Sequence, residues 1–171
     1  MPEVAFTEPL GTISLRGDLS DDGFRAAVTA VTGTPVPDRL RIEGSSQRGA
    51  AWMSPDELLL FLPREEVGPA LARLGEALAG THHLALDVSD LRVCLRVDGP
   101  EAREVLAKLS PADLHPDAFG EGHFRRTRLG QLAAGIWLEG QGARVICFRS
   151  VADYALVLLR QSAADGAVGY F

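Results

Sequence analysis

Carboxylates, hydroxyls and histidines of this 171-residue sequence gather in two short stretches where their types and spacing could support chemistry. In the first stretch, Asp87, Ser89 and Asp90 stand together at the end of an apolar segment. Two neighbouring carboxylates can share a proton and act as general acid and base, and such pairs collect at active sites. Serine and aspartate also build turns by bonding backbone amides, and this structural interpretation is the favoured one.

In the second stretch, Asp113, His115 and Asp117 alternate within a proline-containing segment. Carboxylates and imidazoles ligate metals, but a site needs a third or fourth ligand whose geometry short loops seldom supply alone. We favour a loop held by side-chain to backbone hydrogen bonds. His82 and His83 are adjacent, so on a strand they would point to opposite faces and could not jointly bind one ion.

The two cysteines, Cys94 and Cys147, lie inside apolar strand patterns and away from helix N-termini, where thiolates are favoured. We expect buried, unpaired thiols, because the spacing gives no support to a disulfide. No stretch matches the G-x-S-x-G or Walker pattern. The residues therefore predict no catalytic, cofactor-binding or metal-binding side chain in this chain.

One basic concentration stands out in the sequence, formed by His123, Arg125, Arg126 and Arg128. On a strand, Arg126 and Arg128 would share one face while Arg125 points to the other. Such a row could recognise an acidic partner surface or a polyglutamate tail through bidentate pairs. A charged edge that guards a strand from unwanted pairing explains it equally well, and both interpretations stay open.

The bulk composition restricts the class of protein. A formal net charge of -6 argues against nucleic-acid binding, and 46% hydrophobic residues suit a globular protein with a sizeable core. No apolar run approaches the roughly 20 residues that a membrane span needs. The first residues lack the basic and apolar regions of a secretion signal. We therefore expect a soluble, cytoplasmic protein that contacts neither nucleic acid nor membrane.

The first half of the chain predicts alternating strands and helices. Strands are expected at residues 12–16, 50–53, 57–62 and 82–88, with one helix capped by Ser20 and ended by Gly33 and a second from Val67 to Leu78. The apolar run 58–62 has no polar alternation, so its strand should be covered on both faces. This order is the split βαβ arrangement of a ferredoxin-like unit.

The second half begins in a related way. We expect a strand at 92–97, a helix at 101–109, a compact loop at 110–119, strands at 124–129, 133–138 and 144–148, and a last helix at 151–161. The inward residues of that helix are expected to be Val151, Tyr154, Ala155, Leu158 and Leu159. The sequence thus predicts an α+β fold with mixed or antiparallel sheets, as one compact domain (1–171) with pseudo-halves at about 10–88 and 90–163.

Several segments together carry a family resemblance over roughly residues 10–163. They are 54–63 (SPDELLLFLP), 87–90 (DVSD), 97–106 (VDGPEAREVL), 113–116 (DLHP) with Ala118 and Phe119, and 152–154 (ADY). This pattern resembles the gamma subunit family of heterotetrameric sarcosine oxidase, within the folate-binding aminomethyltransferase superfamily that includes the glycine-cleavage T-protein. Asp90 departs from it, since many superfamily enzymes have His there.

The resemblance implies a subunit without a cofactor of its own. The complex it implies demethylates sarcosine to glycine, forms hydrogen peroxide and passes the one-carbon unit to tetrahydrofolate. It would carry FAD, FMN, NAD and zinc in its alpha, beta and delta subunits, and this chain would be a structural, non-catalytic partner of those subunits. The alternative is a stand-alone folate-binding transferase or repair factor of the same superfamily.

A subunit also needs a contact surface. Stable interfaces bury about 800 Å² per partner and favour arginine and aromatic residues at their centres. Large aromatics and arginines concentrate late in this chain, with Trp52 and Tyr170 as further candidates. We therefore expect the partner interface among Phe119, Phe124, Arg125, Arg126, Arg128 and Trp137.

Overall fold

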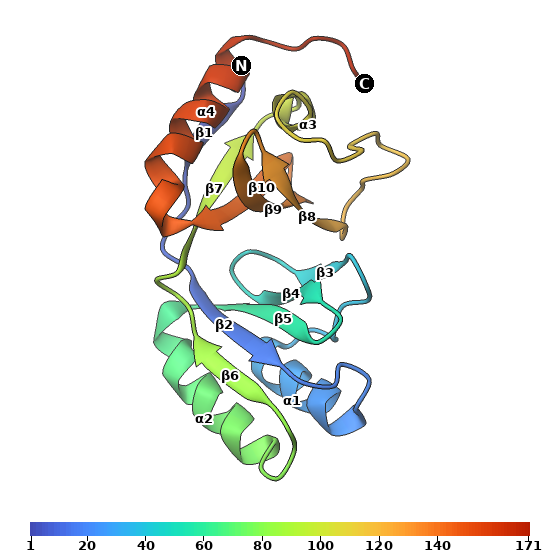
Figure 1. The fold of residues 1–171 in the computed structure, drawn as a ribbon, viewed down its shortest axis with the longest axis vertical. Coiled ribbons are helices and arrows are strands. Elements are labelled where there is room, and N and C mark those ends of the chain that lie inside the picture. Colours follow the sequence, from blue (N-terminus) through green and yellow to red (C-terminus); the bar gives the residue numbers. More distant parts are fainter. The chain divides into compact units, whose positions relative to one another are not determined.

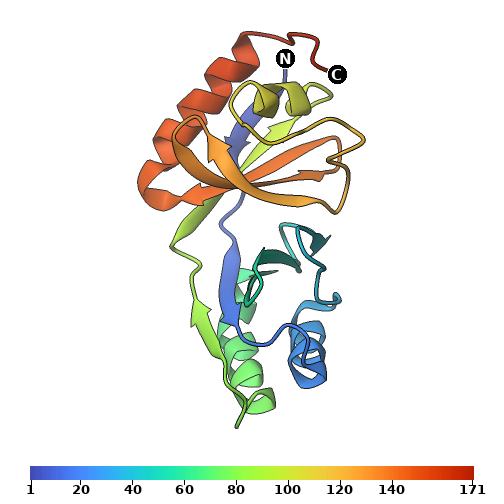
Figure 2. The same cartoon turned by 45° about the vertical axis from the view of Figure 1, so that its right-hand side comes forward.

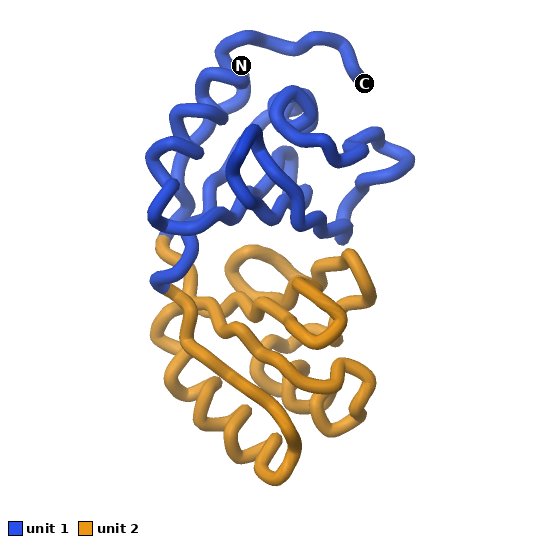
Figure 3. The backbone as a smooth tube through the Cα atoms, in the orientation of Figure 1, with its two compact units in different colours: residues 1–8, 90–171 blue, residues 9–89 orange.

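The computed structural model describes residues 1–171, and the chain divides into two compact units (Figure 3). Unit 1 consists of residues 1–8 and 90–171, and unit 2 of residues 9–89. Each unit has its own five-stranded antiparallel sheet and its own apolar core. The predicted α+β class with antiparallel sheets is confirmed, whereas folding as one domain stays a prediction.

Unit 2 has the ferredoxin-like arrangement that the sequence predicts (Figure 1). Its elements are β2 (Gly11–Arg16), α1 (Asp22–Thr32), β3 (Ile42–Gly44), β4 (Gly49–Ser54), β5 (Glu57–Leu62), a 3-10 turn (Arg64–Glu66), α2 (Val67–Ala77) and β6 (Leu84–Asp87). The sheet order is β3-β4-β5-β2-β6, so the first and last strands of the βαββαβ unit are neighbours. The short edge strand β3 was not predicted.

The ends of α1 show why its cap differs from the prediction. Asp21, and not Ser20, is the N-cap: its Oδ2 accepts a hydrogen bond from the Phe24 amide at 2.8 Å. Ser20 instead donates its hydroxyl to Asp18 Oδ1 at 2.6 Å. Gly33 ends the helix in the left-handed conformation, at a φ of 73°, as predicted.

The apolar strand β5 supplies much of the core of unit 2. Leu58, Leu60 and Leu62 pack with residues of α1, α2 and β2, and every residue from 58 to 62 is at most 1% exposed. The expectation of cover on both faces is therefore confirmed. The edge strand β6 begins at Leu84, two residues later than predicted, so His82 and His83 precede it.

Unit 1 repeats this order of elements with one substitution. Its elements are β1 (Glu3–Phe6), β7 (Arg92–Asp98), α3 (Ala102–Ala107), β8 (Phe124–Leu129), β9 (Leu132–Glu139), β10 (Gly142–Phe148), a 3-10 turn (Arg149–Val151) and α4 (Ala152–Ala164). The sheet order is β1-β7-β10-β9-β8. The edge strand β1, which the sequence did not predict, pairs with β7 from Glu3 opposite Asp98 to Phe6 opposite Leu95.

The helix α4 runs along β1 and β7, as Figure 2 shows, and closes the core of unit 1. Ala155 and Leu159 are fully buried, while Val151 and Leu158 are partly buried. Tyr154, predicted to point inward, is 59% exposed, because the apolar face of the helix is centred one residue further along. None of the helices combines the length and the apolar character of a membrane span.

Candidate functional site

The Asp87–Ser89 stretch is a hydrogen-bonded turn that ends β6. The Ser89 hydroxyl donates to Asp87 Oδ1 at 2.6 Å, and the Ser89 amide donates to the same oxygen at 3.0 Å. Ser89 Oγ in turn accepts the Thr12 amide of β2 at 3.0 Å, and Ser89 is only 7% exposed. Both side chains are thus engaged in closing the turn.

The electrostatics of Asp87 agree with this structural role. The Ser89 hydroxyl, then the Ser89 amide, hold the pKa of Asp87 below its usual range, and Arg64 adds to this. Two carboxylates that share a proton would show the opposite effect, a raised pKa on one of them. Asp90 belongs to unit 1, where its exposed carboxylate lies 3.8 Å from Arg149. The geometry therefore favours the turn over an acid–base pair.

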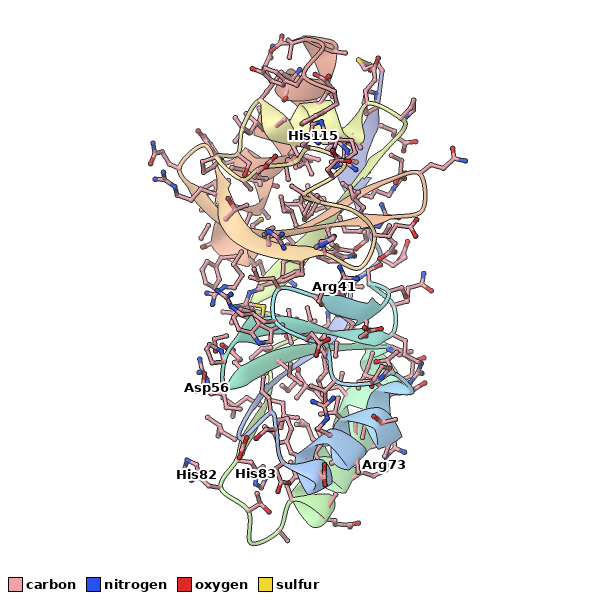
Figure 4. All side chains as sticks on the ribbon, turned by 90° about the vertical axis from the view of Figure 1, so that its right-hand side faces the viewer. Arg41, Asp56, Arg73, His82, His83 and His115 are labelled. Carbon is pink, nitrogen blue, oxygen red and sulfur yellow. The ribbon has the colours of Figure 1, made fainter.

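The alternating residues 113–117 also bond their own backbone. Asp113 Oδ1 accepts the His115 amide at 3.0 Å, and His115 Nδ1 accepts the Asp117 amide at 3.2 Å. In residues 1–171, no group of three or more His, Cys, Asp or Glu side chains is arranged to hold a metal ion. Figure 4 places His115 in unit 1 and His82 and His83 in unit 2.

Both cysteines are buried and unpaired, as predicted. Burial raises the pKa of the Cys94 thiol to about 12, despite a hydrogen bond with Thr7 that acts in the opposite direction. Burial likewise raises the pKa of Cys147. Thiols in this state carry little thiolate and are poor nucleophiles.

The basic strand β8 presents its arginines to opposite faces, as predicted. Arg126 pairs with Gly135 and Arg128 with Ala133 on β9, and both arginines are exposed. Arg125 points to the other face, where it donates to the Ala118 carbonyl at 3.3 Å and lies 5.6 Å above the Phe119 ring.

The aromatic members of the predicted interface lie in the interior. Phe119, Phe124 and Trp137 are each at most 1% exposed. The Phe124 and Trp137 rings are 5.8 Å apart, and Trp137 Nε1 donates to Glu139 Oε2 at 2.9 Å. The exposed part of the predicted interface is therefore the pair Arg126 and Arg128.

A cluster of charges on the unit 1 sheet was missed by sequence reasoning. Asp98 accepts hydrogen bonds from Arg96 at 2.5 Å and Arg144 at 2.8 Å, and Arg96 also pairs with Glu3. Burial would raise the pKa of Asp98, but the two arginines more than offset this and lower it. The cluster depends on β1, β7 and β10 being neighbours, so only a correct strand order could have revealed it.

A shallow hollow lies beside the first helix of each unit. In unit 2 a hollow of about 470 Å³ is lined by Arg25, Arg39 and Trp52 together with proline and aspartate residues. In unit 1 a hollow of about 440 Å³ includes Arg103, whose guanidinium donates to the carbonyls of Leu114 and, at 2.7 Å, Phe119. The sequence predicted neither hollow.

Comparison with known structures first defines the class of fold. Glycine cleavage system aminomethyltransferase T from Bartonella henselae matches with a TM-score of 0.63 and 16% identity, over 91% of this chain and 44% of that one, which shows a shared fold. A chain of the heterotetrameric sarcosine oxidase from Corynebacterium sp. U-96, in complex with pyrrole 2-carboxylate, matches with a TM-score of 0.86 and 27% identity. That match covers 99% of this chain and 87% of the other.

Sequence comparisons then give the family. The model of the sarcosine oxidase, gamma subunit family matches residues 16–165. Sarcosine oxidase subunit gamma from Corynebacterium sp. (strain P-1) is 36% identical over 141 residues, and that from Arthrobacter sp. is 34% identical over 142 residues. Each match covers 81% of this chain and 66% of the relative, so the chain spans just under two thirds of those relatives. The chain belongs to the sarcosine oxidase gamma subunit family, which confirms the sequence resemblance.

Proposed function

We propose that this chain is a structural, non-catalytic subunit of a heterotetrameric sarcosine oxidase, with alpha, beta and delta subunits as its partners in the cytoplasm. The observation that carries the proposal is the match of 99% of the chain, at a TM-score of 0.86, to a chain of such an oxidase. The proposed complex demethylates sarcosine to glycine, transfers the one-carbon unit to tetrahydrofolate and forms hydrogen peroxide. Its FAD, FMN, NAD and zinc are assigned to the other subunits.

The local bonding of the candidate groups supports a non-catalytic role. Asp87 and Ser89 are used by a turn, Asp113 and His115 by a loop, and burial holds the thiols protonated. Each group already has a structural partner, so a reacting substrate would have to compete with it.

Turnover by the assembled oxidase tests that role. We expect complexes that carry Asp87→Asn or His115→Ala to retain sarcosine kcat within about twofold of the wild type, since neither group is assigned to the reaction. A kcat reduced tenfold or more, with normal assembly and normal flavin content, would assign chemistry to this chain and contradict the proposal.

The exposed arginines of β8 are the proposed contact surface. Because oppositely charged surfaces accelerate association, the double substitution Arg126→Glu/Arg128→Glu should slow assembly at least tenfold at low salt. Arg73→Glu, an exposed arginine on α2, is the matched control and should assemble normally. Equal association rates for the double variant and the control would remove this surface from the proposal.

A stand-alone folate-binding transferase or repair factor is the second candidate, supported by the fold shared with the aminomethyltransferase. A ligand that binds only the native state raises the melting temperature, and the shift grows with the logarithm of the free ligand concentration once that exceeds Kd. The isolated chain should therefore melt at a higher temperature in tetrahydrofolate if this candidate is correct. An unchanged melting temperature at saturating concentrations would eliminate it.

A further inference from the structure

A buried carboxylate on α3 holds the segment that follows α4. Glu104 is only 7% exposed, and its carboxylate accepts hydrogen bonds from the amides of Val168 at 3.1 Å, Tyr170 at 2.8 Å and Phe171 at 3.3 Å. Figures 1 and 2 show this segment leaving α4 and passing over α3. One side chain thus fixes three backbone groups of a segment without regular secondary structure.

The C-cap residue of α3 bonds the end of α4 itself. Lys108, the chain's only lysine, donates to the carbonyl of Gly166 at 2.7 Å and to that of Ser162. Ser162 Oγ returns a bond to the Val105 carbonyl at 2.9 Å. Glu104 therefore accepts hydrogen bonds from backbone amides, and Lys108 donates hydrogen bonds to backbone carbonyls. We call this i, i+4 pair of side chains the α3 clasp.

The carboxylate of Glu104 is ionised at neutral pH. Burial would raise the pKa of Glu104, but the amides of residues 168–171 more than offset this and lower it. The segment is consequently held by charge-assisted hydrogen bonds, which are the stronger kind.

The side chains of the held segment point largely to solvent. Val168 is 53% exposed, Tyr170 59% and Phe171 47%. The Phe171 ring also rests 6.0 Å from the His115 ring and 5.8 Å from the Arg103 guanidinium. Segments without regular secondary structure are ordered only where something holds them, because ordering a backbone costs conformational entropy. Here the chain orders a backbone whose apolar side chains gain little burial in return.

We propose that residues 166–171, held by the α3 clasp, are a docking segment for a neighbouring subunit of the oxidase, an inference that rests on the proposed function. A preordered segment that presents tyrosine and phenylalanine has the features of an interface anchor, because ordering before contact removes an entropic cost of binding. Two exposed carboxylates flank the segment: Asp117, whose side chain is 93% exposed, lies beside the His115 ring that contacts Phe171, and Asp165 directly precedes the segment in sequence. We therefore expect the segment to insert into an apolar groove of the partner subunit, with arginine or lysine at the edge of that groove.

The test uses the full chain and the other subunits of the same host's oxidase. We expect the double substitution Tyr170→Ala/Phe171→Ala to speed dissociation of the assembled complex at least tenfold, measured by surface plasmon resonance. Tyr154→Ala is the matched control, since Tyr154 on α4 is also 59% exposed, and it should dissociate within twofold of the wild-type rate.

A second variant tests the clasp without touching the docking side chains. Glu104→Gln keeps the shape of the side chain and removes its charge, so hydrogen exchange at the amides of residues 168–171 should accelerate and the complex should dissociate at least fivefold faster. Wild-type dissociation rates for both the double variant and Glu104→Gln would overturn the docking role and leave the proposed function standing. Failure of the wild-type chain to bind the other subunits would overturn the proposed function itself.

Discussion

The sheets of the two units have the same strand order, but the edge strand beside the first strand of each repeat comes from a different part of the chain. In unit 2 the strand after α2 is β6, which continues the chain, whereas in unit 1 the position beside β7 is occupied by β1 from the start of the chain. The chain consequently passes between the units twice, after residues 8 and 89. The sheet of unit 2 is therefore formed by one contiguous stretch of sequence, whereas the sheet of unit 1 is assembled from two stretches that the backbone of unit 2 connects.

The connectors differ as much as the closing strands. The connector after α1 is short and contains Leu40, the one residue other than glycine with a positive φ, at 62°. The connector after α3 is longer, and its carbonyls at Leu114 and Phe119 take the guanidinium of Arg103. The connector after α3 thus provides the hydrogen-bond acceptors for the arginine that lines the hollow of unit 1.

Among the tests of this comparison, truncating core side chains should have the largest effect on the free energy of unfolding. Leu60 in unit 2 and Ile136 in unit 1 are fully buried, so replacing either with alanine should lower the free energy of unfolding by about 2–5 kcal/mol. Because the backbone joins the units twice, we expect each substitution to shift the unfolding of both units together.

Tryptophan fluorescence in urea separates the two units, since Trp52 belongs to unit 2 and Trp137 to unit 1. Adding Trp52→Phe to each core variant leaves Trp137 as the only fluorescent tryptophan, and adding Trp137→Phe leaves Trp52. Coincident midpoints would support folding as one domain. A midpoint that moves for one probe alone would show two independently folding units.

The caps of the first helices differ between the units, because Asp21 caps α1 with its side chain whereas Glu101 gives α3 no such bond. Asp21→Ala should lower the free energy of unfolding by about 1 kcal/mol. Ser20→Ala, the neighbouring control, should change it by less than about 0.5 kcal/mol. If urea unfolding showed a larger loss of stability for Ser20→Ala than for Asp21→Ala, Ser20 would be the cap instead.

The charge cluster around Asp98 should make unit 1 sensitive to acid. The pKa of Asp98 is lowered in the folded state. The stabilisation that ionised Asp98 provides is therefore present above the ordinary aspartate pKa and is lost as pH falls through the lowered value. Solvent exposure limits the effect to below about 1 kcal/mol. Unfolding of Asp98→Asn from pH 2 to 6 should depend less steeply on pH than that of the wild type, and an identical dependence would argue against the cluster.

A circular permutation should have the smallest effect. A chain that opens at Pro9 and carries residues 1–8 after residue 171, through a short glycine linker, makes unit 1 contiguous. Since β1 would still pair with β7, the free energy of unfolding should change by less than about 1 kcal/mol, given the weak dependence of closure entropy on loop length. A permutant opened within β8 is the control and should lose the folded state. Loss of folding in the permutant that opens at Pro9 would contradict the pairing of β1 with β7.

Local patterns predicted much of this fold, and long-range pairing explains what they missed. The bounds of β8 and β5 followed from alternation, turn residues and an unbroken apolar run. Strand β1 has only four residues, and its pairing with β7 joins positions about ninety residues apart, which no local pattern encodes. For the same reason the Asp98 cluster and the α3 clasp were invisible, because both exist only after distant elements pack together.

The aromatic residues of the expected interface illustrate a related limit. Composition indicated Phe119, Phe124 and Trp137 as contact candidates, but large aromatics serve cores as readily as interfaces. Burial decides between these roles, and it leaves Arg126 and Arg128 as the exposed members.

Affinity purification of the tagged chain from its host, at low salt, tests the proposed subunit role most directly. The measurement is flavin absorbance and subunit composition across a sizing column. We predict that the 18.3 kDa chain elutes with larger subunits and with flavin absorbance, at a mass of a four-chain complex. A stable monomer of 18.3 kDa that carries no flavoprotein with it would contradict the account.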